Sequence, residues 1–112
     1  MNMPTELHEI TNAVALEAEK AFGDRLERVL LYGSYARGDY DDQSDVDIMV
    51  IVNAAPEEIH EASKPIRKLC GELLYEYGVV VSVCVQDSAT WRRFADALPF
   101  FRNVRGEGIG IA

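Results

Sequence analysis

The chain has 112 residues, 48% of them hydrophobic and 27% charged, and its 19 acidic and 11 basic residues give a net charge of −8. This length and composition favour one folded domain over residues 1–112 and exclude a disordered chain. The acidic balance disfavours direct binding to nucleic acid, because binding to a phosphate backbone depends on lysine and arginine. We interpret a late basic cluster as a solvated or partner-facing surface: Arg92, Arg93, Arg102 and Arg105.

The sequence carries no signal for a membrane or for secretion. No apolar run approaches the ~20 residues of a membrane-spanning helix, and the N-terminus lacks the basic-then-apolar pattern of a secretory leader. Cys70 and Cys84 have no CxxC or Cys/His spacing, so we expect free thiols instead of a zinc site or a disulfide. We therefore expect a soluble, cytoplasmic protein without a membrane partner.

In the first half of the chain, apolar spacing predicts a helix over residues 5–22, between Pro4 and Gly23. A short β-favouring run predicts a buried strand over residues 28–32. Residues 33–44 are polar and contain two glycines, so we expect a loop with at most one helical turn.

In the second half, two apolar runs rich in β-branched residues predict strands over residues 46–52 and 79–85. Between them, residues 57–77 have helical spacing, and Pro65 predicts a short helix followed by a longer one. A brief helix is expected over residues 90–98, ended by the proline that follows. This order predicts an α/β (α+β) domain in which helices flank a small mixed sheet.

Two carboxylates, Asp45 and Asp47, lie two residues apart at the start of the second predicted strand. Because alternate side chains of a strand share a face, the two carboxylates converge and repel each other unless a cation lies between them. Mg²⁺ is the natural cation, since it prefers oxygen ligands and is commonly held by one or two carboxylates together with substrate phosphates. Taken alone, the pair is better explained by a strand that enters from a solvated loop, with Asp45 outside and Asp47 at a sheet edge.

Gly33 and Ser34 follow directly after the first predicted strand. The glycine lets backbone N–H groups approach an anion, and the serine adds a hydroxyl donor, although an ordinary turn would use the same residues. Arg37 is a candidate for binding phosphate or for pairing with a structural carboxylate such as Asp39 or Asp45, and we slightly favour the pairing.

The two motifs together are more specific than either alone. Gly33-Ser34, ten intervening residues and Asp45-x-Asp47 resemble the signature of the DNA polymerase β-like nucleotidyltransferases. The segments Gly33–Gly38 and Ser44–Asp47 resemble, more narrowly, the minimal nucleotidyltransferase (MNT) branch. The resemblance implies that Gly33 and Ser34 hold the phosphates of ATP or another nucleoside triphosphate, while Asp45 and Asp47 bind Mg²⁺ and serve catalysis.

The third predicted strand departs from this family pattern. Active members usually carry a third carboxylate there, whereas this chain has Ser82 in the polar position. A serine neither matches the charge of a carboxylate nor acts as a general base at neutral pH. Asp87 or the loop residues Asp39, Asp41 and Asp42 are the alternatives, so nucleotide binding is better supported than turnover.

The resemblance implies an enzyme that transfers a nucleoside monophosphate, expected to be AMP, to a protein hydroxyl. Stand-alone MNT proteins commonly act as the antitoxin to a HEPN-domain toxin, so it also implies a HEPN-type partner, and it leaves a homo-oligomer open. One alternative is a catalytically degenerate nucleotide-binding module that neutralises its partner by stoichiometric binding. A small-molecule transferase is disfavoured, because this short chain has no further substrate-binding region.

Overall fold

The structure is a computed structural model that describes residues 3–111. The expected domain range also includes residues 1, 2 and 112, which lie outside this description. The helices are α1 (Met3–Phe22), α2 (Ser34–Arg37), α3 (Pro56–Ala62), α4 (Lys64–Tyr77), α5 (Ser88–Phe94) and α6 (Pro99–Glu107), with a 3-10 turn at Gly23–Arg25. The strands are β1 (Leu26–Tyr32), β2 (Val46–Val52), β3 (Val81–Asp87) and β4 (Ile109–Gly110). Within the described range, no helix is long and apolar enough to cross a membrane.

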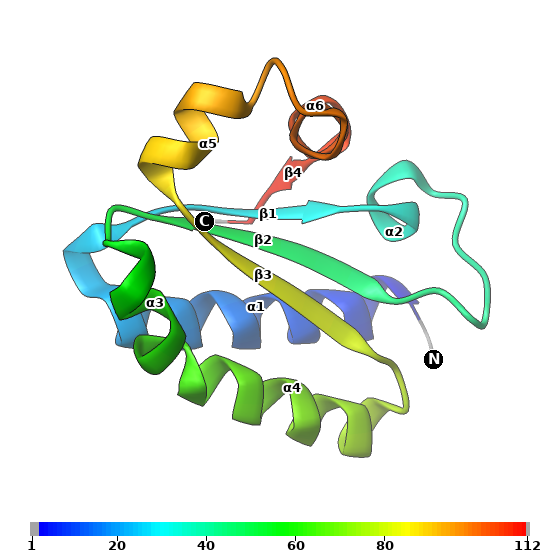
Figure 1. The fold of residues 1–112 in the computed structure, drawn as a ribbon. Coiled ribbons are helices and arrows are strands. Elements are labelled where there is room, and N and C mark those ends of the chain that lie inside the picture. Colours follow the sequence, from blue (N-terminus) through cyan, green and yellow to red (C-terminus); the bar gives the residue numbers. More distant parts are fainter. Residues whose placement is uncertain (1–2, 112) are drawn as a thin grey trace.

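The four strands form one mixed sheet in the order β3-β2-β1-β4 (Figure 1). Strand β1 is antiparallel to both β2 and β4, whereas β2 and β3 are parallel. A parallel pair needs a crossover, and α3 and α4 supply it between β2 and β3. The expected fold class, a small mixed sheet flanked by helices, is confirmed.

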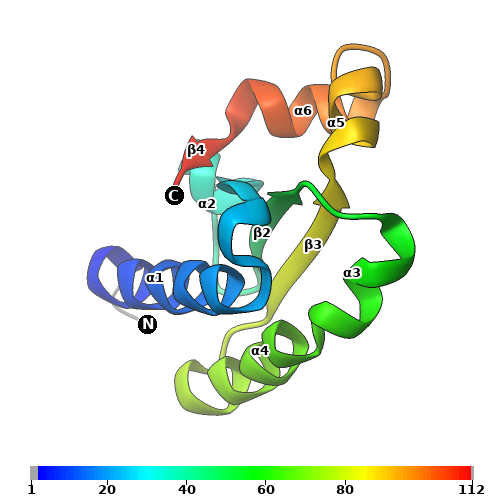
Figure 2. The same cartoon turned by 90° about the vertical axis from the view of Figure 1, so that its left-hand side faces the viewer.

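Strand β2 contributes side chains to a hydrophobic core on each face of the sheet. Val46, Ile48 and Val50 belong to the core shared with α1 and α4, and Met49 and Ile51 belong to a second core with α5 and α6. Figures 1 and 2 show α1, α3 and α4 on one side of the sheet and α5 and α6 on the other. Alternation along β2 therefore directs the side chain of Asp47, like that of Met49, to the α5/α6 face.

The C-terminal quarter differs most from expectation. The helix predicted over residues 90–98 is wrong at both ends, because α5 spans Ser88–Phe94 and a second helix begins at Pro99. Proline is favoured in the first turn of a helix, where its missing N–H has no intrahelical partner, so Pro99 starts a helix instead of ending one. The short strand β4 was not predicted either.

Asp87 joins β3 to α5 as a helix cap. Its side chain accepts a hydrogen bond of 2.9 Å from the backbone N–H of Thr90. Burial raises the pKa of Asp87, but the hydrogen bonds from Thr90 and Gln86 outweigh burial and lower it. The ionised carboxylate is therefore the form that the folded state stabilises.

Replacing Asp87 with alanine removes this cap and should lower the free energy of unfolding by about 1 kcal/mol at neutral pH. Since the pKa of Asp87 is lowered on folding, this contribution should be lost as the pH falls through that pKa. Urea unfolding at several pH values checks both effects, with Glu72→Ala on the exposed face of α4 as the control. Equal stability of Asp87→Ala and the unmodified protein at neutral pH would contradict the capping role.

Candidate functional site

Gly33 adopts a backbone conformation that only glycine accepts readily. Its φ of 80° and ψ of −159° lie outside the regions open to other residues. A Cβ atom built on Gly33 would also collide with Oδ2 of Asp47, whose Cα pairs with that of Tyr32 in the β1/β2 register. The glycine therefore allows the turn after β1 to lie directly against the Asp47 carboxylate.

The turn of helix α2 is anchored at both ends. The carbonyl of Gly33 accepts hydrogen bonds from the N–H groups of Ala36 and Arg37, at 3.1 and 3.0 Å. The buried ring of Tyr35 stacks on Tyr40 with centroids 4.6 Å apart. This anchoring places Ser34, half-buried, at the first position of α2, next to Gly33.

Asp45 and Asp47 differ in their surroundings. Asp45 is exposed just before β2, whereas Asp47 is half-buried at the second position of the strand. Burial raises the pKa of Asp47, and the negative charges of Asp45 and Glu107 raise it further, while Arg37 lowers it. Burial and neighbouring negative charge therefore both disfavour the ionised form of Asp47, and a bound cation would stabilise it.

Ser82 lies beside Asp47, because these residues are partners in the parallel β2/β3 register. Asp87 pairs with Val52 at the far end of the same strands, five residues from Ser82, and caps α5. At ~3.3 Å per residue it is too far away to act as the missing carboxylate, so that alternative is wrong. Within residues 3–111, no group of three or more His, Cys, Asp or Glu side chains is placed to hold a metal ion.

Two of the acidic loop residues, Asp39 and Asp41, are held by local contacts. Asp39 pairs with Arg37 at 3.2 Å. Asp41 accepts hydrogen bonds from the N–H of Gln43 and the hydroxyl of Ser44, at 2.8 and 3.4 Å. These contacts give Asp39 and Asp41 structural roles within the loop, and Asp39 is one of the two carboxylates, with Asp45, that the sequence offered to Arg37.

Glu107 is the residue at this site that the sequence did not indicate. From the last position of α6, its Oε1 accepts a hydrogen bond from the N–H of Gly33 at 3.1 Å. Its Oε2 accepts one from Nη1 of Arg37 at 2.9 Å. No motif surrounds Glu107, and its proximity depends on α6 folding back over β1, so no sequence signal could have identified it.

Two of the four arginines in the late cluster form ion pairs. Arg92 pairs with Glu27 at 3.2 Å, and Arg105 pairs with Asp96. These ion pairs neutralise part of the positive charge that nucleic-acid binding would need.

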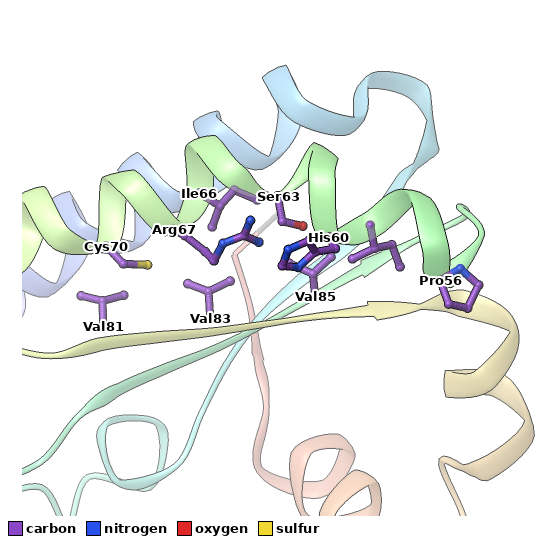
Figure 3. A pocket seen from close by; sticks show the side chains of 10 residues that line it. Pro56, His60, Ser63, Ile66, Arg67, Cys70, Val81, Val83 and Val85 are labelled. Atoms are coloured by element: carbon purple, nitrogen blue, oxygen red, sulfur yellow. The ribbon is translucent and has the colours of Figure 1, made fainter.

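A separate cavity of about 460 Å³ lies between β3 and the α3/α4 pair. Figure 3 shows Val81 and Val83 pointing from β3 toward Cys70 and Arg67 of α4, and Val85 lying beside His60 of α3. Because side chains alternate along a strand, these valines face away from Ser82 and the candidate site. The cavity is therefore distinct from the site at the ends of β1 and β2.

The donor set at the candidate site fits a hard divalent cation. Both carboxylates offer oxygen, which Mg²⁺ prefers, and two carboxylates leave coordination positions for substrate oxygens. Burial, and then the negative charges of Asp45 and Glu107, raise the pKa of Asp47, so a cation bound there would stabilise its ionised form. Asp45 and Asp47 are thus suited to hold a metal that arrives with an anionic substrate.

Comparison with known proteins supports a role in nucleotide chemistry. The family model of the nucleotidyltransferase domain matches residues 15–101. Two Methanocaldococcus jannaschii proteins, each named "putative protein adenylyltransferase", are similar over most of their length. One is 32% identical over 108 residues, covering 96% of both chains, and the other is 34% identical over 91 residues, covering 81% of this chain and 90% of the relative.

Two solved structures share the fold. One, titled a "putative nucleotidyltransferase from Sulfolobus solfataricus", has a TM-score of 0.56 at 22% identity and covers 92% of this chain and 77% of its own. A chain of a toxin–antitoxin structure with AMP-PNP has a TM-score of 0.51 at 18% identity and covers 89% of this chain and 71% of its own. At these identities the likeness is one of fold.

Replacing Asp47 with asparagine should stabilise the ligand-free protein by up to about 1 kcal/mol at neutral pH, since it removes a poorly compensated charge that is partly screened by solvent. The pKa of Asp47 is raised on folding, so its charge destabilises the folded state above that pKa. The gain should therefore shrink as the pH falls through the raised pKa. Urea unfolding from pH 7 downward measures it, with Asp42→Asn as the charge-matched control; a loss of stability in Asp47→Asn alone would contradict the assignment.

Proposed function

This chain belongs to the nucleotidyltransferase domain family, and from that premise we propose that it binds a nucleoside triphosphate with Mg²⁺ and transfers a nucleoside monophosphate to a protein hydroxyl. The observation that carries the proposal is the close approach of Gly33 to the Asp47 carboxylate. This approach places the phosphate donors, the Gly33 N–H and the Ser34 hydroxyl, beside the carboxylates that would bind a metal. A metal-bound triphosphate needs both.

In this proposal Gly33, Ser34 and Arg37 bind the β- and γ-phosphates. The N–H of Gly33 and the hydroxyl of Ser34 are neutral donors, and Arg37 adds a charged one. The anchoring of α2 keeps these donors in place before the nucleotide arrives, so little ordering is needed on binding.

Asp45 and Asp47 are the proposed metal ligands and the catalytic carboxylates. Asp47 is half-buried, so water competes less for its oxygens than for those of exposed Asp45. When bound, Mg²⁺ would neutralise triphosphate charge and stabilise the charge that develops at the α-phosphate during transfer. The two side chains keep the reacting phosphate close to the sheet end, where an acceptor hydroxyl can approach from solvent.

The acceptor and its setting are proposed from the relatives. The Methanocaldococcus jannaschii proteins are named for protein adenylyltransferase activity, which supports ATP as the nucleotide and a protein as the acceptor. The likeness of fold to the chain in the toxin–antitoxin structure and the MNT-like motif support a HEPN-type toxin as the partner, with this chain as a cytoplasmic antitoxin.

A second candidate function is supported by Ser82. A serine lies beside Asp47 where a third carboxylate would complete the site, and no group of three or more His, Cys, Asp or Glu side chains among the described residues is placed to hold a metal ion. A chain that binds Mg-ATP without efficient transfer would then neutralise its partner by stoichiometric binding.

The double variant Asp45→Asn/Asp47→Asn should bind Mg-ATP at least about tenfold more weakly than the unmodified protein, since it loses both charged metal ligands. Its circular-dichroism spectrum should be unchanged, because neither carboxylate packs in the core. Isothermal titration calorimetry measures the affinity. The matched control, Glu57→Gln/Glu72→Gln, removes two charges from exposed positions of α3 and α4. Equal Mg-ATP affinity in both double variants would contradict the site assignment.

Ser82→Asp should decide between catalyst and binding module. A carboxylate beside Asp47 should raise AMP transfer to a cognate toxin by about tenfold or more, since a positioned general base contributes ~10²–10⁴. The added charge should also lower stability without Mg²⁺, and Mg-ATP should partly restore it. Transfer of label from α-³²P ATP and thermal unfolding measure the two effects. If the unmodified protein already transfers AMP as fast as Ser82→Asp, the binding-module alternative fails.

A further inference from the structure

The carboxylate of Glu107 holds two of the donors that the proposed function gives to the triphosphate. Its oxygens lie 3.1 Å from the backbone N of Gly33 and 2.9 Å from Nη1 of Arg37. The Glu107 side chain is 20% exposed, so its bond to Gly33 is partly shielded from water, whereas its bond to Arg37 lies at the surface. A carboxylate bound by a backbone N–H and a guanidinium occupies the kind of environment that suits a phosphate oxygen.

The chain on either side of Glu107 fixes this carboxylate at the end of β1. Gly108 follows it and lies against Leu30 of β1. Ile109 then pairs with Leu31 in the β1/β4 ladder, one residue from Tyr32. The short connection from α6 to β4 leaves Glu107 next to the turn after β1, so its contact with Gly33 is set by the sheet.

A single N–H cannot donate fully to Glu107 and to a phosphate at once. Charge adds to this competition, because Glu107 lies close enough to Asp47 to raise its pKa. An incoming triphosphate would meet a third carboxylate where it needs donors. Rotation of the Glu107 side chain relieves both conflicts, since that side chain has rotatable bonds. Gly33 directly follows Tyr32, which pairs with Asp47 in the β1/β2 register, so its backbone is held by the sheet.

We propose that Glu107 occupies a phosphate position of the nucleotide site and that the triphosphate must displace it, so that Glu107 determines the affinity of the site for phosphate groups. This inference rests on the proposed function. Glu107 acts through Gly33 and Arg37, which makes it a positioning residue. In the ligand-free protein it keeps both donors oriented, and it lowers the affinity for any anion that cannot replace its two bonds.

Glu107→Gln separates charge from shape. The glutamine carbonyl can still accept from the N–H of Gly33, but it carries no charge to oppose the phosphates or to pair with Arg37. Calorimetry should give a dissociation constant for Mg-ATP that is about three- to tenfold lower than that of the unmodified protein, as loss of a like charge predicts. Mg-tripolyphosphate should show the same change, because the effect lies at the phosphates. Glu72→Gln, which removes one exposed charge from α4, should leave both values unchanged.

A second measurement, by NMR, follows the Glu107 carboxylate directly in the unmodified protein. In the unmodified protein, the carboxyl carbon resonance of Glu107 should shift when Mg-tripolyphosphate is added, as its bonds to Gly33 and Arg37 are replaced by bonds to solvent. Assignment of that resonance is checked by its absence from the spectrum of Glu107→Gln.

The outcomes distinguish this inference from the proposed function. If Mg-ATP binds the unmodified protein but binds Glu107→Gln equally or more weakly, or if the carboxyl resonance of Glu107 stays fixed, Glu107 is a structural brace and the inference is wrong while the proposed function stands. If Mg-ATP and Mg-tripolyphosphate bind neither protein, the proposed function fails and the inference fails with it.

Discussion

The approach of the Gly33 backbone to the Asp47 carboxylate is the constraint on which the site depends. It requires a glycine for two independent reasons, a positive φ and the space that a Cβ would take from Oδ2 of Asp47. It also requires β1 and β2 to pair in the observed register, with Tyr32 opposite Asp47. The sheet, the turn and the carboxylate therefore form a single unit, in which displacement of one would displace the others.

The ligand-free site carries more negative than positive charge around Asp47. Asp45 and Glu107 both act on Asp47 with negative charge, and Arg37 is the compensating cation that the structure provides nearby. Arg37 itself divides its guanidinium between Asp39 and Glu107. A metal-bound triphosphate supplies what such a site lacks, since it brings positive charge to the carboxylates and new acceptors to the donors.

Much of this arrangement could be predicted from the sequence because it is local. The turn after β1 and the start of β2 are close in the chain, and alternation along a strand is enough to put Asp47 on one face. The position of Ser82 followed from an apolar run with one polar residue. Glu107 could not be predicted, because its hydrogen bond with Gly33 joins residues that are 74 positions apart in the sequence. The helix that carries Glu107 begins at Pro99, and a proline at that position is equally compatible with the end of the preceding helix.

The most direct measurement is an amide ¹H–¹⁵N titration of the protein with Mg-ATP. If Gly33 and Asp47 form one nucleotide site, shifts should concentrate at the ends of β1 and β2, on Gly33, Ser34 and Asp47, and on Ser82 beside them. They should be much smaller with ATP in the presence of EDTA, since the carboxylates then face the triphosphate without a cation. Shifts confined to the cavity between β3 and α4, around Ile66 and Val83, or equal shifts with and without Mg²⁺, would contradict the site.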